Sequence, residues 1–185
     1  MRRLGLACAL LATLAACGRE PTPIEPTATQ TTPAHKSAPP SASSTLTPPK
    51  LPAIANRNDA TAAANFVVYW VKVSNYAALT GDTDLLRRIS DPNCEGCNRY
   101  IDLYEKTYAA GGYFRGGVQK VRSIEHEQGT EEHFFLCELQ MPPGTYRKSR
   151  DSKPVMTEAE TSKLVFAVAP EGLSWVVSQV GPALK

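Results

Sequence analysis

Apolar side chains repeat at a helical spacing between residues 58 and 110. The first repeat predicts a helix over residues 58–79, which Asn58 or Asp59 can cap at its start and Gly81 can close at its end. Four apolar residues share one face of this predicted helix: Phe66, Trp70, Val73 and Ala77.

Two further helices are expected after Gly81. Asp82 can cap a short one that carries Leu85, Leu86 and Ile89 inward, and the turn at residues 90–93 contains Pro92. Asn93 can cap the third, which ends at Gly111-Gly112. Its apolar stripe consists of Cys97, Ile101, Tyr104 and Tyr108.

The apolar period changes to two after residue 118, which is typical of strands. Residues 118–127 and 132–141 predict one hairpin, and residues 163–169 and 173–180 predict another. The polar residues 146–162 fit either a long loop or an extra strand. Helices first and antiparallel strands afterwards indicate an α+β domain over residues 59–182, with three N-terminal helices packed on a sheet of about four strands.

The start of the chain has the pattern of an export signal. Arg2 and Arg3 precede an apolar run at residues 4–13, which is too short to span a bilayer. The sequence L-A-A-C-G at residues 14–18 looks like a bacterial lipobox. We therefore expect residues 1–16 to be a lipoprotein signal peptide and Cys17 to carry a diacylglyceryl group that anchors the protein to the cell membrane, exposed on its extracytoplasmic face. The alternative is ordinary secretion after cleavage at an Ala-x-Ala-like site.

Residues 17–58 have the composition of a stalk. Residues 18–58 contain 9 prolines, 7 threonines and 4 serines and no aromatic residue. Such a segment cannot bury enough apolar surface to offset the entropy of ordering, so we expect it to be disordered.

Charge argues against one class of partner. Without Arg2 and Arg3 the chain has 18 basic and 18 acidic side chains, so it offers no basic field for phosphates. We expect no nucleic-acid partner. The partner is expected to be an unknown envelope protein or a small ligand.

Five cysteines fall into three contexts. Cys8 lies in the expected signal peptide. Because an exported protein meets an oxidising environment, we expect Cys94 and Cys97 to form a structural disulfide at the start of the third helix. Cys137 is then left on an apolar strand face as a buried thiol, although its pairing with either helix cysteine stays open.

Two other interpretations of the Cys94-x-x-Cys97 pair were considered. A redox site is supported by the helix N-terminus, which lowers a thiol pKa, but the strand that precedes such a motif in thioredoxin-like folds is missing. A zinc site would need Cys94, Cys97, Cys137 and His133 together, and exported thiols tend to oxidise first. We predict no metal and no cofactor.

Catalysis would need an inward carboxylate or histidine. The candidates are Asp102, Glu105 and His126, but the two carboxylates fall away from the apolar stripe of the third helix. We therefore predict no catalytic residue and favour a non-catalytic binding or interaction domain. The alternative is a small-molecule enzyme or ligand carrier, with a possible pocket formed by Trp70, Tyr100, Tyr104 and Tyr108.

Several short motifs together resemble a known family. They are Asn75-Tyr76-Ala77, Thr80-Gly81-Asp82, Cys94-x-x-Cys97, residues 108–112 (Y-A-A-G-G) and Gly116-Gly117. Together with the lipobox and the stalk they resemble an actinobacterial lipoprotein family, domain of unknown function 6318, over residues 63–180. The resemblance implies a cone-shaped fold similar to nuclear transport factor 2, in which a curved sheet is wrapped by three helices. It implies no activity, and Cys137 departs from the family pattern.

Overall fold

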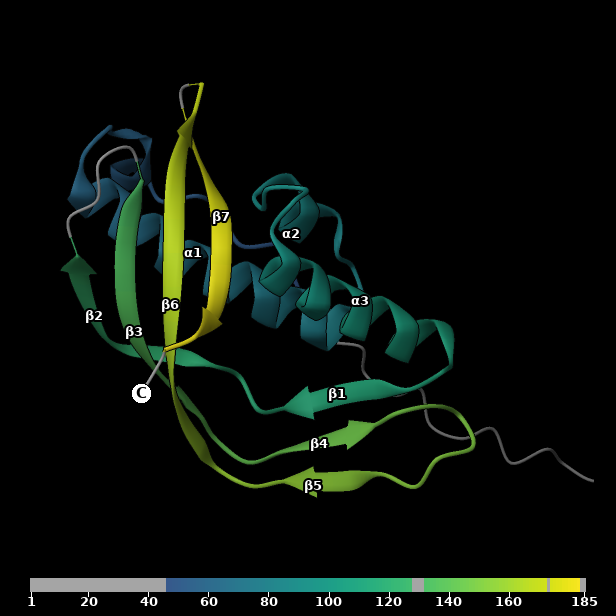
Figure 1. Cartoon of the computed structure of the whole chain (residues 1–185). Helices are drawn as coiled ribbons and strands as arrows, with labels where there is room; N and C mark the ends of the chain where they lie inside the picture. The colour runs from purple at the N-terminus through teal and green to yellow at the C-terminus, as the bar shows by residue number, and fades with distance from the viewer. Residues whose placement is uncertain (1–45, 128–131, 173, 184–185) are drawn as a thin grey trace, which may run out of the picture. The chain divides into compact units, whose positions relative to one another are not determined.

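The helices lie where the apolar spacing predicts them. A computed structural model describes residues 46–127, 132–172 and 174–183. Helix α1 spans Ala60–Thr80, α2 spans Asp84–Arg88 and α3 spans Glu95–Ala109 (Figure 1). A short 3-10 helix, η1 (Ala53–Asn56), precedes α1 and is not predicted by the sequence pattern. Ala55 of η1 is fully buried in the core, so packed structure begins before residue 59.

The ends of α1 are fixed by side chains and by one glycine. The carboxylate of Asp59 accepts a hydrogen bond of 2.9 Å from the backbone N–H of Ala62, which satisfies one of the free donors at the helix start. Gly81 has a φ of 80° and closes the helix with its N–H on the carbonyl of Ala77. A side chain there would also collide with Tyr108, because a Cβ on Gly81 would lie 2.6 Å from that ring.

The strands form two antiparallel sheets. The four-stranded sheet has the order β2-β3-β6-β7, and the three-stranded sheet has the order β1-β4-β5. The described residues hold these strands: β1 (Tyr113–Gly116), β2 (Lys120–Glu127), β3 (His133–Met141), β4 (Gly144–Arg147), β5 (Val155–Thr157), β6 (Glu160–Glu171) and β7 (Ser174–Pro182). The predicted α+β class is therefore confirmed, and the second sheet is an addition to it.

Strand pairing keeps one register across the break between the two sheets. Met141 pairs with Glu160 at the end of the β3–β6 ladder, and Gly144 pairs with Thr157 at the start of the β4–β5 ladder. From the first pair to the second, the chain moves three residues forward on one side and three residues back on the other. The segments β3–β4 and β5–β6 therefore form one long hairpin that bends at Pro142-Pro143. The β1–β2 edge follows β4–β3 in the same way, which gives the curved surface seen in Figure 1.

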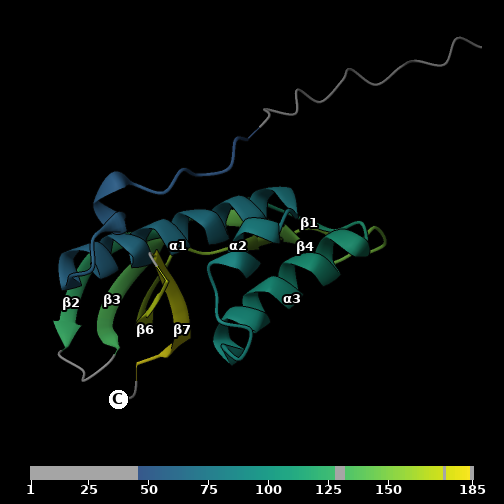
Figure 2. The ribbon, with the colours of Figure 1, turned by 90° about the horizontal axis from the view of Figure 1, so that it is seen from above.

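The core lies between α1 and the four-stranded sheet. Helix α1 runs across the strands, and α3 lies beside β7 (Figure 2). Phe66, Trp70 and Val73 of α1 are at most 1% exposed, and they share one core cluster with Phe135 and Phe166 of the sheet. Within the described residues no helix is long and apolar enough to cross a membrane.

Candidate functional site

A chain of aromatic rings fills the space between α1, α3 and the bent sheet. The Trp70 ring lies edge-on to Phe166 at 5.6 Å and to Tyr100 at 5.8 Å. Tyr104 contacts Phe114 at 5.6 Å, and Phe114 stacks on Tyr146 at 4.9 Å. The paired rings are in contact, so no ligand fits between the members of a pair.

The buried polar atoms of these rings have partners. The indole Nε1 of Trp70 donates to the hydroxyl of Ser90 at 2.8 Å, and the hydroxyls of Tyr104 and Ser74 are 3.0 Å apart. Burial raises the pKa of Tyr104 well above its ordinary value. The polar atoms of Trp70 and Tyr104 are therefore satisfied within the protein, and neither needs a ligand as a partner.

The four residues predicted to line a pocket have different surroundings. Trp70 is 1% exposed and belongs to the core. Tyr108 packs on Gly81 and donates its hydroxyl to the carbonyl of Ala78 at 2.9 Å. Tyr100 and Tyr104 line a cavity of about 180 Å³ together with Phe114 and Met141. The structure thus brings two of the four together at one cavity.

A separate hollow of about 220 Å³ lies on the other side of Tyr100 and Leu103, along α3. Tyr100 and Leu103 line both, and the second hollow is also lined by Leu164 of β6 and by Pro182 at the end of β7. Leu103 is 44% exposed, which is high for a large apolar side chain. Ligand pockets usually measure about 300–1,000 Å³, so each of these hollows suits a single side chain better than a whole small molecule.

The candidate acids of α3 are paired at the surface. Asp102 accepts a hydrogen bond of 2.7 Å from Lys106, and this bond lowers the pKa of Asp102. Glu105 accepts hydrogen bonds from Thr83 and Arg87, and these lower its pKa as well. A general acid at neutral pH needs a raised pKa, so neither carboxyl is suited to that work.

The hollow between α1 and β2 has a different character. It measures about 560 Å³ and runs between Val68 to Asn75 of α1 and Val118 to Ile124. Its apolar lining includes Val68, Val71, Val121 and Ile124. Its charged lining consists of Lys72, Lys120 and Arg122, with no acidic residue. We call this hollow the α1–β2 groove.

The position of the α1–β2 groove depends on one asparagine. The side chain of Asn75 donates to the carbonyl of Gln119 at 2.8 Å and accepts from the N–H of Gln119 at 2.9 Å. This pair of bonds ties the segment before β2 to α1 and sets the width of the groove. Sequence reasoning missed the groove, because Asn75 and Gln119 are 44 residues apart. The apolar alternation at residues 118–124 predicts a strand, but it does not show that this strand lies at the edge of the sheet.

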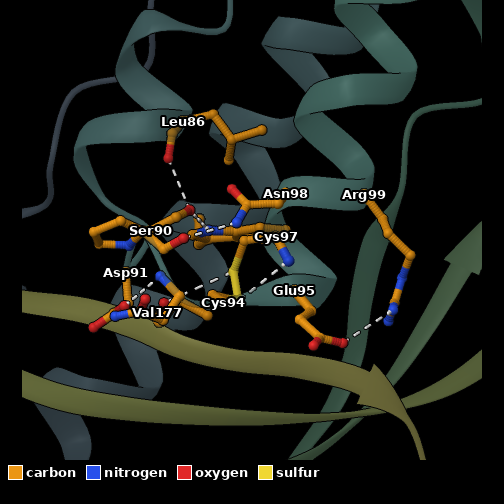
Figure 3. Close-up of a disulfide and its surroundings, with 12 residues drawn as sticks. Leu86, Ser90, Asp91, Cys94, Glu95, Cys97, Asn98, Arg99 and Val177 are labelled. Carbon is orange, nitrogen blue, oxygen red and sulfur yellow. Dashed lines mark hydrogen bonds and ion pairs between the residues drawn. A yellow bond between two sulfur atoms is a disulfide. The ribbon is translucent and has the colours of Figure 1, made fainter.

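The cysteine pair lies under β7. The sulfurs of Cys94 and Cys97 are at disulfide distance, and their Cα atoms are 5.3 Å apart (Figure 3). Both residues are at most 1% exposed. The turn before them is hydrogen-bonded to the same strand, with the N–H of Asp91 donating to the carbonyl of Val177 at 2.9 Å. A disulfide covered on this side is poorly placed for exchange with an outside thiol.

Cys137 lies apart as a buried free thiol on β3. Burial raises its pKa to about 12, so it is neither a nucleophile nor a ready metal ligand at neutral pH. The four zinc ligands considered from the sequence are not gathered, since no group of three or more His, Cys, Asp or Glu in the described residues could hold a metal. The expected lipid attachment at Cys17, the signal peptide and most of the stalk lie outside the described residues.

Comparison with known proteins identifies a family and a fold. The model of a family described as "Family of unknown function (DUF6318)" matches residues 28–180. No curated protein matches the chain. The crystal structure of the intermembrane space region of the chloroplast protein ARC6 is similar, with a TM-score of 0.52, 14% identity and coverage of 70% of this chain and 99% of that one. At this identity the likeness shows the fold alone, and the cone shape of nuclear transport factor 2 stays a prediction.

Proposed function

We propose that the chain, which belongs to the DUF6318 family, is an exported lipoprotein whose folded domain binds a segment of an envelope protein without catalysing a reaction. The anchor in this proposal is the diacylglyceryl group on Cys17, which rests on the lipobox at residues 14–18. The binding surface in this proposal is the α1–β2 groove.

The packed interior supports a non-catalytic role. Where a hollow cone would hold a substrate, this domain has Trp70, Tyr104 and Phe114 in contact with other rings. The lowered pKa values of Asp102 and Glu105 leave no poised acid in α3. The small cavity at Tyr100 and Tyr104 is about 180 Å³, which does not favour the alternative of an enzyme or ligand carrier.

The α1–β2 groove is the observation that carries the proposal. It combines a floor of valine and isoleucine with three cationic side chains, and none of the three takes part in an ion pair with a described residue. Apolar contacts supply affinity, and unpaired charges on the rim select a partner of opposite charge. The groove therefore suits a segment that carries both apolar and acidic side chains.

The edge strand beside the groove favours an extended segment. Strand β2 pairs only with β3 among the described strands, so its outer edge is free. An extended chain laid along such an edge places alternate side chains in the neighbouring hollow. The register irregularity between Val121 and Ser123, together with Lys120 and Arg122, also keeps this edge from pairing indiscriminately.

Photocrosslinking in intact cells tests the proposal. A photoreactive residue at Ser123, which is exposed in the groove, should give a discrete crosslinked product. Adding Lys120→Glu and Arg122→Glu should abolish that product, because the rim charge is reversed. The matched control is Lys148→Glu with Lys153→Glu, two exposed charges away from the groove, and it should leave the product unchanged. Crosslinking that survives the groove reversal, or that is lost equally in the control, would refute the groove as the binding surface.

A further inference from the structure

Two histidines meet where strand β2 ends and strand β3 begins. His126 lies near the end of β2 and His133 begins β3. The Nε2 atom of His126 is 3.1 Å from the Nδ1 atom of His133. His126 is exposed and His133 is half-buried, so the two nitrogens are within reach of solutes. The end of β2 and the start of β3 lie at the end of the sheet where α1 begins (Figure 1).

Neighbouring aromatic rings hold both imidazoles in place. His126 packs on Phe135 with ring centres 5.1 Å apart, and His133 meets the edge of Trp175 at 5.4 Å. Phe135 is 1% exposed and Trp175 is 3% exposed. Trp175 is itself fixed, because its indole Nε1 donates to the carbonyl of Arg57 at 3.0 Å. The histidine pair therefore rests on the rigid core and not on a loose surface.

The separation of the two nitrogens matches that of two ligands on one ion. An imidazole nitrogen binds zinc at about 2.0–2.1 Å, so two of them lie about 2.9 Å apart at a right angle and about 3.3 Å apart at the tetrahedral angle. The observed 3.1 Å falls between these values. We propose that His126 and His133 form a surface site for one divalent transition-metal ion of the zinc, copper or nickel class, with water in the remaining positions.

The chemistry of the surroundings agrees with a cation at this place. Imidazole nitrogen is a ligand that zinc, copper and nickel share, whereas calcium and magnesium prefer oxygen. Glu125 and Glu127 flank His126 along the strand.

A bond between two neutral rings is the rival explanation of the short distance. In that case one imidazole donates its proton to the other, and the pair contributes only to the stability of the hairpin. The two explanations differ in one respect: only a metal site responds to an added ion. The site also lies apart from the residues that line the α1–β2 groove, so its test is independent of the proposed binding function.

Calorimetric titration of the full chain with Zn²⁺ separates these explanations. Accessible thiols are first blocked with N-ethylmaleimide, so that Cys8 and Cys17 cannot compete for the ion. We expect one Zn²⁺ per chain, and we expect His126→Ala and His133→Ala each to weaken binding at least tenfold. The third histidine of the sequence provides the control, since His35→Ala should bind Zn²⁺ as the unchanged chain does.

Two further measurements keep the test decisive. Because His133 packs on Trp175, thermal unfolding without metal should first show that each variant is folded. The exposed His126→Ala variant alone is sufficient if His133→Ala fails to fold. With Cu²⁺ as probe, electron paramagnetic resonance should show two nitrogen ligands in the unchanged chain and one in the His126→Ala variant. The absence of Zn²⁺ binding, or binding that His126→Ala leaves intact, would overturn the proposal.

Discussion

Asn75 joins two parts of the chain that are distant in sequence. Its side-chain amide offers both a donor and an acceptor, and the backbone of Gln119 uses both, as a neighbouring strand would. The residue stands in the first of the motifs by which the family is recognised, and in this structure its work is structural. It fixes the wall of a groove and does not itself carry chemistry.

The next motif closes a helix. Thr80 donates its hydroxyl to the carbonyl of Tyr76 at 2.7 Å, and the hydroxyl of Tyr76 donates to Asp82 at 2.9 Å. Gly81 between them allows Tyr108 of α3 to pack directly on the backbone. These contacts join the end of α1 to the end of α3, so the sequence signature marks a helix joint.

Cys137 should resist modification in the folded protein. Burial raises its pKa from 9.0 to about 12, so the folded thiol stays protonated where the unfolded thiol would ionise. The folded pKa is the higher one, and the associated stability is therefore present below pH 9.0 and is lost as the pH rises to about 12. Peptide mapping after N-ethylmaleimide treatment at pH 8 should find Cys137 unmodified until denaturant is added.

The unfolding midpoint supplies the second readout for Cys137. The thermal unfolding midpoint should decrease as the pH is raised from 9 to 12. Tyr104 adds to this decrease because its pKa is also raised. In the Cys137→Ala variant the fall should be smaller. Modification of Cys137 in native protein at the rate seen in denaturant would contradict its burial.

At the scale of elements, helices were easier to predict than strands. The apolar stripe of α1 repeats over 21 residues, so a single exception does not hide the pattern. Strand β1 has four residues and β5 has three, which is too short for an alternating pattern to be recognised. Pro142-Pro143 interrupts the hydrogen bonding directly after residue 141, where the sequence pattern ends the predicted strand. The structure shows that the ladder resumes in the same register, because the partner strand skips two residues at the same place. A pairing of this kind depends on both strands and cannot be seen in either alone.

The candidate site was only partly accessible from sequence for a similar reason. Helical spacing assigns Tyr104 to the inward stripe of the third helix, whereas Tyr100 is expected only as a possible pocket residue. The α1–β2 groove and the histidine pair could not be predicted in this way, because each depends on residues that meet only after the sheet has formed. His126 and His133 are seven residues apart, and it is the pairing of β2 with β3 that brings their side chains together.

The junction of α3 with β7 is expected to be sensitive to its crosslink. Closing a loop as short as that between Cys94 and Cys97 contributes on the order of 2 kcal/mol in the chain-entropy model. The double variant Cys94→Ala, Cys97→Ala should lose about that much free energy of unfolding, measured in urea. Urea unfolding of the unchanged protein in the presence of a phosphine reductant should show a similar loss of free energy. If neither the variant nor the reduced protein has a lower urea midpoint, the prediction is contradicted.

Close packing at the same junction explains a neighbouring glycine. A Cβ on Gly96 would lie within 1.8 Å of the carbonyl oxygen of Val180, which is backbone and cannot move aside. Helix α3 therefore begins in direct contact with β7. The disulfide and Gly96 together set the angle at which α3 leaves the sheet.

At the scale of the molecule, attachment to the membrane is proposed to depend on one cysteine. Cys17→Ala should move the protein from the membrane fraction to the soluble fraction of cells, because no acyl chain can then be added. Cys8→Ala changes a cysteine in the same segment and should leave the protein attached. Immunoblotting of the two fractions measures both, and retention of the Cys17→Ala variant would contradict the lipobox interpretation.

The covering of the disulfide by β7 has a consequence for the order of assembly. Cys94 and Cys97 precede β7 by more than 75 residues, and β7 ends at Pro182. Once Val177 and Val180 have docked, an oxidant no longer reaches the sulfurs. Oxidation therefore has to come first, while the final strand is still undocked. Strand β7 then covers a bond that was made earlier, and a chain that folds before it is oxidised would keep both thiols reduced.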